Sequence, residues 1–309
     1  MIAIDVGAFG QFVAAHLTQS LGIAPSEMAT LSEFEIDSRN SEALVVLGPD
    51  RARLEQVLTP EIRWVHVLST GVDGFPFDLM EGRVLTCSRG ASAIAISEFV
   101  LAAMLDFEKH LSSVWISGPE QWHENGLGQL FGRKVGLVGI GAIGGAVATR
   151  ALAFGMDVLA YRRTPTPSPV GNVALVTSLE DLLTQVDHLV VAAPATPATH
   201  HLLNAQSLGA LKPGAHLINV SRGSLIDHDD LLDALDAGQV SMATLDVTEP
   251  EPLPAGHPLY SHVRVRISPH VSWNSPETAR GSVGLFTENV RLHLAGEPLH
   301  GVVDLSSGY

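Results

Sequence analysis

The chain has 309 residues, of which 46% are hydrophobic and 17% charged, a balance that predicts folded domains with cores of their own. Lys and Arg number 18 against 33 Asp and Glu, so the formal net charge is -15 at pH 7. A field of this sign repels phosphate backbones and anionic lipid, which argues against nucleic acid and membrane surfaces as partners.

The N-terminus has no basic region ahead of an apolar stretch, and the longest apolar run, 91–105, contains Ser92, Ser97 and Glu98. We therefore expect neither a signal peptide nor a membrane span. Cys87 is the single cysteine, which excludes an internal disulfide and fits a reducing compartment. The expected location is the cytoplasm, and Cys87 is interpreted as a small, half-buried apolar residue.

Short apolar strands alternate with helical segments along the chain, the pattern of parallel sheets with helices on both faces. In the first part we expect strands at 2–6, 43–47, 64–68 and 84–86, crossover helices at 9–21 and 51–58, and a buried or interface helix at 92–111. From Lys134 onward we expect six strands, the number that a complete dinucleotide-binding sheet requires, at 135–138, 157–161, 188–192, 216–220, 242–247 and 263–267. Helices are expected near 143–154, 179–183, 205–211, 229–237 and 277–295, and a surface loop at 164–169.

A glycine-rich turn follows the first strand of this second series. Gly139, Gly141 and Gly144 have the G-x-G-x-x-G spacing between an apolar strand and an Ala-rich helix. Gly139 would permit the tight turn, Gly141 the approach of a pyrophosphate, and Gly144 the close packing of helix on strand. The helix N-terminus, at Ala142 and Ile143, would offer N–H groups to the phosphates. The alternative is an ordinary glycine-rich turn.

Two arginines end the next strand, in the string Tyr161-Arg162-Arg163-Thr164. A site for NAD has Asp or Glu about 20 residues beyond the glycines, where it binds the ribose 2′-hydroxyl. Guanidinium groups and a hydroxyl suit the 2′-phosphate of NADP instead. We therefore predict NADP as the cofactor, with NAD possible; a solvated basic pair is the alternative.

Three sets of residues that are candidates for binding or catalysis each follow a strand of the second series. They are Arg222, an acidic stretch from Asp246 to Glu251, and His270. Because the carboxyl ends of parallel strands line the ligand crevice of an open sheet, we expect the arginine, a carboxylate and the histidine to converge on one site.

The other histidines are expected to be structural or solvated. His200 and His201 are adjacent, so their side chains are expected to point in divergent directions, and His257 and His262 match no motif. Glu249 is interpreted as a solvated neighbour of the site. No Cys or His cluster has metal-ligand spacing, and we predict no metal.

Taken together, these motifs make the chain resemble the D-isomer-specific 2-hydroxyacid dehydrogenases. Within that family, it is most similar to the glyoxylate and hydroxypyruvate reductases. The resemblance covers about 64–294, and the first 60 residues match only in general character. In chain order, the matching segments are Gly71-Val72-Asp73, Ser97-Glu98, 137–144, 194–199, Val220-Ser221-Arg222-Gly223, Leu245-Asp246-Val247, Pro250-Glu251-Pro252 and Pro269-His270.

The resemblance implies an oxidoreductase that transfers hydride between NADP(H) and a small 2-oxo acid or D-2-hydroxy acid. Arg222 would bind the substrate carboxylate and polarise the oxo group, with backbone N–H groups around Thr70–Val72 on the other side. His270 would be the general acid, and Glu251 would pair with it and keep the imidazolium available near neutrality. The family's glutamate lies five residues beyond its aspartate, which selects Glu251 over Glu249.

Further contacts follow from the same resemblance. Asp246 would touch the nicotinamide side of the cofactor pocket, and His270 would border it. The chain has Val271-Ser272-Trp273-Asn274 where many relatives have a glycine-rich turn, so Trp273 either closes the pocket over a small substrate or packs between domains. The remaining implied cofactor contacts are Ala193, Pro194, Thr199, Val220 and Ser221, and the implied substrate contacts are Leu47, Thr70, Gly71, Val72 and Trp273.

The implied architecture is α/β, with two Rossmann-like, doubly wound parallel-sheet domains and an active-site cleft between them. A flavodoxin-like substrate domain would comprise residues 1–98 plus 275–309, and a dinucleotide-binding domain 99–274. The helix 97–111 and the segment to Trp122 would form a homodimer interface. Two alternatives stay open. One is phosphite or formate oxidation, although formate enzymes of this fold have Gln in place of Glu251. The other is a cofactor-sensing, corepressor-like regulator.

Overall fold

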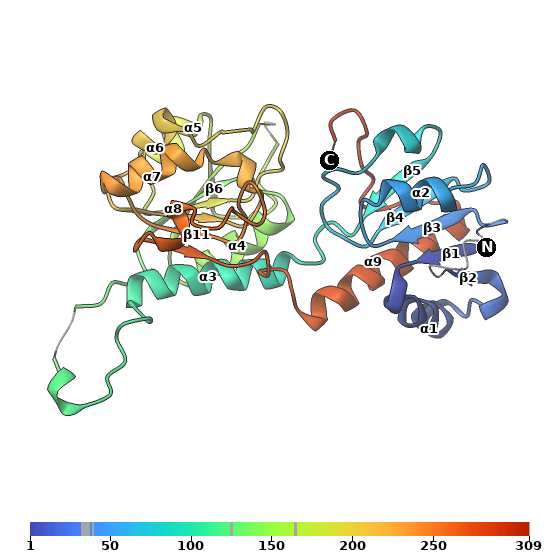
Figure 1. Ribbon diagram of the computed structural model, residues 1–309, viewed down its shortest axis with the longest axis horizontal. Coiled ribbons are helices and arrows are strands. Elements are labelled where there is room, and N and C mark those ends of the chain that lie inside the picture. Colours follow the sequence, from blue (N-terminus) through green and yellow to red (C-terminus); the bar gives the residue numbers. More distant parts are fainter. Residues whose placement is uncertain (32–37, 39, 124–125, 164–165, 309) are drawn as a thin grey trace. The chain divides into compact units, whose positions relative to one another are not determined.

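Two parallel sheets organise the chain in the computed structural model, which describes residues 1–31, 38, 40–123, 126–163 and 166–308. Unit 1 comprises Met1–Ser92 and Asn274–Tyr309, and unit 2 comprises Ala93–Trp273. Every strand pair in both sheets is parallel, and helices cover both faces of each sheet (Figure 1). The predicted fold class, α/β with two parallel-sheet domains, is confirmed.

The sheet of unit 1 has the strand order β2-β1-β3-β4-β5. Its residues alternate between two cores, because successive side chains of a strand point to opposite faces. Ile2 and Ile4 pack with α1 and α9, whereas Ala3 packs on the side of α2. The elements are β1 (Ile2–Asp5), η1 (Gly7–Phe9), α1 (Gly10–Leu21), η2 (Pro25–Glu27), β2 (Met28–Thr30), β3 (Ala43–Val46), α2 (Arg51–Val57), β4 (Trp64–Val67), η3 (Phe77–Met80), β5 (Val84–Cys87) and α9 (Pro276–Ala295). Cys87 is buried in β5, and this burial raises the pKa of its thiol.

The sheet of unit 2 has the order β12-β11-β10-β9-β6-β7-β8, so the chain changes direction across the sheet beside β6. Helices α5, α6 and α7 cover one face, and α3 and α4 cover the other (Figure 1). The strands are β6 (Lys134–Val138), β7 (Asp157–Tyr161), β8 (Val173–Val176), β9 (His188–Val191), β10 (Ala215–Asn219), β11 (Val240–Leu245) and β12 (Val265–Ile267). The helices are α3 (Ala93–Lys109), η4 (Pro119–Gln121), α4 (Ala142–Ala153), α5 (Leu179–Leu183), α6 (Ala205–Gly209), η5 (Gly223–Leu225), α7 (His228–Asp236) and α8 (Pro258–Ser261).

Two strands differ from the sequence-based expectation. Both β2 and β8 are short strands at a sheet edge that the apolar pattern did not predict. Neither contains a fully buried residue, and the two central residues of β8 are exposed. β2 and β8 therefore lack the buried run by which the central strands are recognised.

The chain leaves the body of unit 2 between α3 and β6. Residues 110–123, which we call the arm, extend away from the end of α3 in Figure 1 and include η4. The arm exposes large aromatic side chains: Trp115 is 78% exposed and Trp122 is 81% exposed.

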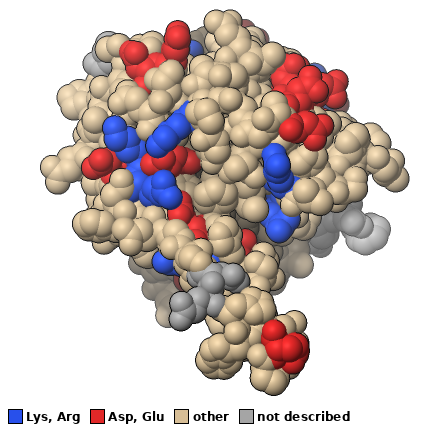
Figure 2. Space-filling view, turned by 90° about the vertical axis from the view of Figure 1, so that its left-hand side faces the viewer, with Lys and Arg blue, Asp and Glu red and all other residues tan. Residues whose placement is uncertain are grey.

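Charged side chains of both signs share the surface. On the face shown in Figure 2, Lys and Arg side chains form small groups, with Asp and Glu side chains between some of them. Ion pairs in unit 2 include Asp187 with Lys212, at 2.5 Å, and with Arg133, at 3.8 Å. No helix in the described part of the chain combines the length and apolar character needed to cross a membrane.

Candidate active site

The glycine-rich turn lies between β6 and α4, where β9 and β7 flank β6. Gly139 has a φ of +97°, and a Cβ there would lie 2.8 Å from the carbonyl oxygen of Ala192. A Cβ on Gly144 would clash with the carbonyl group of Gly139, whereas Gly141 faces open space. Packing therefore requires the first and third glycines, and the second leaves room at the N-terminus of α4. These residues fit the pyrophosphate of a dinucleotide.

The end of β7 lies against this turn. The N–H of Gly139 donates a hydrogen bond to the carbonyl oxygen of Tyr161, at 2.9 Å. Arg162 follows directly, and its guanidinium donates to the carbonyl oxygen of Pro167, at 3.3 Å. Arg163 is exposed at the same strand end, and Thr164 lies outside the described residues. Two cationic side chains thus stand where the ribose of a dinucleotide is expected.

Hydrogen bonds from its own side chains hold the loop after β9 together. Thr199 Oγ1 donates to the carbonyl oxygen of Pro194, at 2.8 Å, and accepts from the N–H of Thr196, at 2.8 Å. The hydroxyl of Ser221 donates to the carbonyl oxygen of Ala193, which joins the ends of β9 and β10. These implied cofactor contacts therefore share one edge of the sheet with the glycine turn.

His270 and Glu251 form a pair beyond β12. Nδ1 of His270 lies 3.0 Å from Oε2 of Glu251, and the two side chains are 38% and 41% exposed. Oε1 of Glu251 accepts from the N–H of Thr248, at 3.0 Å. Because Nδ1 faces the carboxylate, Nε2 of His270 is the nitrogen left to exchange a proton with a ligand.

Asp246 holds the turn that carries this histidine. Its buried carboxylate accepts from the hydroxyl of Ser268 at 2.6 Å, the N–H of Val271 at 2.9 Å and the N–H of Ser272 at 3.0 Å. Its carbonyl oxygen accepts from the N–H of His270, at 2.9 Å. The sequence did not indicate this positioning role, for which the only signal was an acidic residue directly after a strand.

Arg222 follows β10 in a turn held by a second buried polar residue. Asn219 has no exposed surface; its amide donates to the carbonyl oxygen of Arg222, at 2.9 Å, and accepts from the N–H of Ser221, at 3.1 Å. A guanidinium nitrogen of Arg222 donates to the carbonyl oxygen of Ser221, at 2.7 Å. Sequence reasoning gave Asn219 no role, although a polar residue at the end of a buried strand was a usable signal.

The turn of Arg222 and the loop of Glu251 are in direct contact. A Cβ on Gly223 would clash with the peptide that joins Thr248 to Glu249. Since β10, β11 and β12 are adjacent, the structure brings the arginine turn, the glutamate and the histidine to one edge of the unit 2 sheet.

The implied substrate residues of unit 1 lie at the carboxyl edge of its own sheet. Leu47, directly after β3, is 52% exposed, and it lines a cavity of about 390 Å³ with Asp5 and Arg53. Arg53 Nε lies 2.8 Å from Asp5 Oδ2, a pair that sequence reasoning missed because its partners are far apart in the chain. Thr70 Oγ1 lies 3.0 Å from Ser92 Oγ.

The other residues of this set differ in exposure. Gly71 accepts a hydrogen bond at its carbonyl oxygen from Ser69 Oγ, at 2.7 Å, and Val72 is buried. Trp273, the last residue of unit 2, is 45% exposed.

The expectation that His200 and His201 diverge is wrong. Their ring centroids lie 4.0 Å apart, and the planes are inclined by 20°, so the rings stack. His201 has a φ of +47°, and this left-handed backbone turns its side chain to the side of its neighbour, where an extended residue would point away.

Comparisons with known proteins bear on this arrangement. Residues 101–272 match the family model described as D-isomer specific 2-hydroxyacid dehydrogenase, NAD binding domain. The hydroxypyruvate reductase of Blautia hydrogenotrophica is 30% identical over 279 residues, which cover 86% of this chain and 87% of that protein. The glyoxylate/hydroxypyruvate reductase A of Serratia proteamaculans is 32% identical over 284 residues, covering 88% of this chain and 89% of that protein.

A solved structure of a protein from the same family matches the whole chain. The D-isomer specific 2-hydroxyacid dehydrogenase from Xanthobacter autotrophicus Py2, in complex with NADPH and MES, matches with a TM-score of 0.83 and 28% sequence identity. The match covers 100% of this chain and 99% of that one. The resemblance carried by the motifs is confirmed: the chain belongs to the D-isomer-specific 2-hydroxyacid dehydrogenases, a family of oxidoreductases, and contains their NAD-binding domain.

Proposed function

We propose that the chain reduces a small 2-oxo acid of the glyoxylate or hydroxypyruvate type to the hydroxy acid with NADPH, or catalyses the reverse reaction. The observation that carries this proposal is the 3.0 Å pair of His270 and Glu251, at the same sheet edge as the turn of Arg222. A proton donor with a carboxylate partner and a guanidinium are the groups that reduction of a 2-oxo acid needs. Relatives named as reductases of hydroxypyruvate and glyoxylate support this substrate class.

The proposed roles follow from the chemistry of each side chain. A bound nicotinamide cofactor supplies the hydride that the carbonyl carbon accepts. Arg222 binds the substrate carboxylate, because its planar fork matches two carboxylate oxygens. His270 donates a proton from Nε2 to the carbonyl oxygen, and Glu251 stabilises the imidazolium until it does so. In the oxidative direction, neutral His270 accepts the proton from the hydroxyl.

Unit 2 is proposed to bind the cofactor, and unit 1 to supply substrate contacts through Leu47 and 70–72. The preference for NADP rests on Arg162 and Arg163 at the end of β7, where a carboxylate would repel the 2′-phosphate. The NADPH complex of the Xanthobacter relative is consistent with this choice.

A turnover screen tests the proposed function. NADPH oxidation is measured with glyoxylate, hydroxypyruvate, pyruvate, phenylpyruvate and branched 2-oxo acids, and reduction of NADP with phosphite. We expect the highest kcat/KM with glyoxylate or hydroxypyruvate. NADPH binding without turnover of any 2-oxo acid would instead favour a cofactor-sensing regulator, and turnover of phosphite alone would favour that oxidation.

A further inference from the structure

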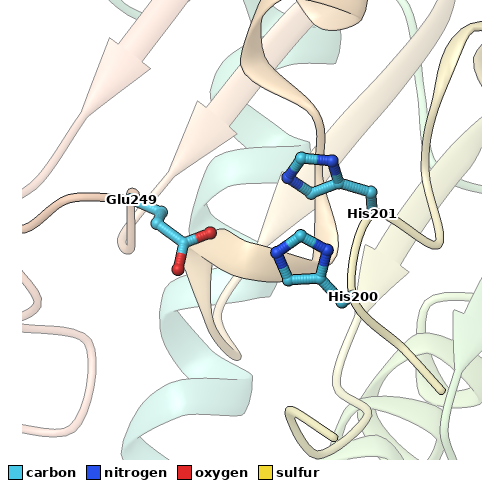
Figure 3. Close-up of side chains that lie close together, drawn as sticks. All are labelled: His200, His201 and Glu249. Atoms are coloured by element: carbon cyan, nitrogen blue, oxygen red, sulfur yellow. The ribbon is translucent and has the colours of Figure 1, made fainter. Parts of the chain in front are cut away.

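A second group of ligand-type side chains lies outside the proposed catalytic set. Figure 3 shows Glu249 reaching toward the rings of His200 and His201 from a different segment of the chain. Among the described residues, these three can each offer one ligand atom, and the atoms all lie within 4.8 Å of one another. The histidines follow β9, whereas Glu249 follows β11, so the fold brings together groups that the sequence separates.

One short stretch of backbone anchors both halves of this group. The N–H of His201 donates to the carbonyl oxygen of Ser224, at 2.8 Å. The peptide that enters Glu249 packs against Gly223, where a Cβ would clash with it. Both residues belong to η5, so the distance between the histidines and the glutamate is set by backbone contacts and does not depend on flexible side chains alone.

The ring of His201 is oriented by a carboxylate. Its Nδ1 lies 3.0 Å from Oδ2 of Asp227, and the two side chains are 40% and 28% exposed. This arrangement recurs around metal-bound histidines, because the carboxylate fixes the ring and leaves Nε2 as the donor to the ion. Asp227 also caps α7 by accepting from the N–H of Asp230, at 3.2 Å, which fixes the carboxylate in turn.

The charges around the three groups favour a cation. Asp227 and Glu249 are acidic, and Glu249 makes no hydrogen bond or ion pair with another described residue.

We propose that His200, His201 and Glu249 form a binding site for a divalent transition-metal ion, with Zn²⁺ as the best match. Two imidazole nitrogens and one carboxylate oxygen form a donor set that Zn²⁺ accepts, with one position open. Mg²⁺ and Ca²⁺ prefer oxygen donors throughout. Ligand atoms around a tetrahedral Zn²⁺ stand about 3.3 Å apart. The three groups therefore need to approach one another by at most about 1.5 Å, which rotation of the exposed side chains of His200 and Glu249 allows.

Calorimetric titration of the chelator-treated full chain with ZnCl₂ tests the proposal. We expect one Zn²⁺ per chain, with the affinity lowered at least tenfold in His200→Ala and in Glu249→Gln. Asp227→Asn keeps the helix cap but weakens the hold on the ring, and should lower the affinity by about tenfold. His262→Ala is the matched control, because His262 also lies beside a carboxylate, 3.3 Å from Asp236, but outside the group. The His262→Ala variant should bind Zn²⁺ with the same affinity as the unchanged chain.

A spectroscopic measurement distinguishes the site from weak surface binding. Co²⁺ in place of Zn²⁺ should give the intense visible absorption of a tetrahedral ion, and this absorption should be lost in the triple variant His200→Ala, His201→Asn, Glu249→Gln. Circular dichroism and thermal unfolding in the presence of a chelator establish that the variants are folded. The proposal is overturned if the unchanged chain shows no saturable Zn²⁺ binding, or if the triple variant binds Zn²⁺ with the same affinity. It concerns binding alone and stands or falls independently of the proposed reductase activity.

Discussion

His270 owes its ring orientation to Glu251 and its backbone position to Asp246. Replacing His270 with Ala should lower kcat for reduction by on the order of 10² or more, the contribution of one general acid. Glu251→Gln keeps a hydrogen-bond acceptor but removes the charge, so a smaller loss of about tenfold is expected. Steady-state kinetics with NADPH measure both effects, and His262→Ala serves as the control. Turnover near that of the unchanged chain in a folded His270→Ala variant would refute the assignment.

Arg162 and Arg163 determine the proposed cofactor preference. A charge-assisted hydrogen bond contributes roughly 1.5–3 kcal/mol, so two imperfectly placed arginines should favour NADPH over NADH by about ten- to a thousandfold in kcat/KM. The double change Arg162→Asp with Arg163→Ala should reverse this order, mainly through the KM of the cofactor. Arg280→Ala, an exposed arginine of unit 1, is the control. Equal efficiency with both cofactors would contradict the preference and leave the proposed reaction intact.

At the scale of the elements, the contact between η5 and the loop after β11 links the arginine turn to Glu251. Gly223→Ala should break this contact, because its Cβ would meet the peptide joining Thr248 to Glu249, which cannot rotate away. We expect a loss of at least about tenfold in kcat/KM and of about 1–3 kcal/mol in the free energy of unfolding.

Kinetics and urea unfolding measure the effect of Gly223→Ala. The control is Gly209→Ala, at the end of α6, where an added Cβ has open space. That change should leave activity unaltered and stabilise the chain by up to about 1 kcal/mol, since alanine favours helix over glycine. Identical behaviour of the two variants would show that the contact does not position the loop.

At the scale of the whole molecule, a buried neutral histidine makes stability depend on pH. His66 in β4 has no exposed surface, and burial lowers its pKa to about 3 from an ordinary 6.5. Its ring nitrogens lie 2.7 Å from Thr86 Oγ1 and 3.1 Å from Ser88 Oγ. The unfolded chain therefore binds a proton below pH 6.5 that the folded chain does not, and stability present above that pH is lost as the pH falls.

His66 should make the free energy of unfolding decrease by about 1.4 kcal/mol per pH unit as the pH falls from 6 to 4. Urea unfolding at a series of pH values measures the free energy of unfolding. As the pH falls, this free energy should decrease more steeply for the unchanged chain than for His66→Gln, by about 1.4 kcal/mol per pH unit. His123→Gln, at an exposed histidine, should keep the original slope. Parallel curves for the unchanged chain and His66→Gln would mean that His66 takes up its proton without unfolding.

The proposed homodimer interface is formed by the helix 97–111 and the segment that follows it to Trp122. Trp115 and Trp122 are 78% and 81% exposed, and each tryptophan can bury on the order of 150–250 Å² against a partner. Analytical ultracentrifugation should show a dimer that the double change Trp115→Ser with Trp122→Ser converts to a monomer. Val263→Ser, at a valine that is 82% exposed but outside the arm, should leave the dimer intact. A monomeric unchanged chain would exclude this interface.

Features that depend on neighbouring residues could be predicted from the sequence alone. The central strands and long helices are visible because apolar periodicity reports which faces are buried. Gly139 and Gly144 stand in the turn that their spacing predicted, since any larger side chain would meet the backbone there. The order of the motifs likewise identified the family. Each motif is a run of a few consecutive residues, so it can be read from the sequence without knowing where the fold places it.

Only the tertiary structure decided which distant residues meet. The strand order places Asp246 against the turn of His270, pairs Arg53 with Asp5, and recruits β2 and β8 as edges that have no buried pattern of their own. It also brings Glu249 to His200 and His201, a grouping that ligand spacing in the sequence did not reveal. Such contacts join segments separated by tens of residues, and their geometry depends on the order of strands and the backbone packing of loops. Local sequence specifies the elements, but these long-range contacts arise only when the sheets assemble.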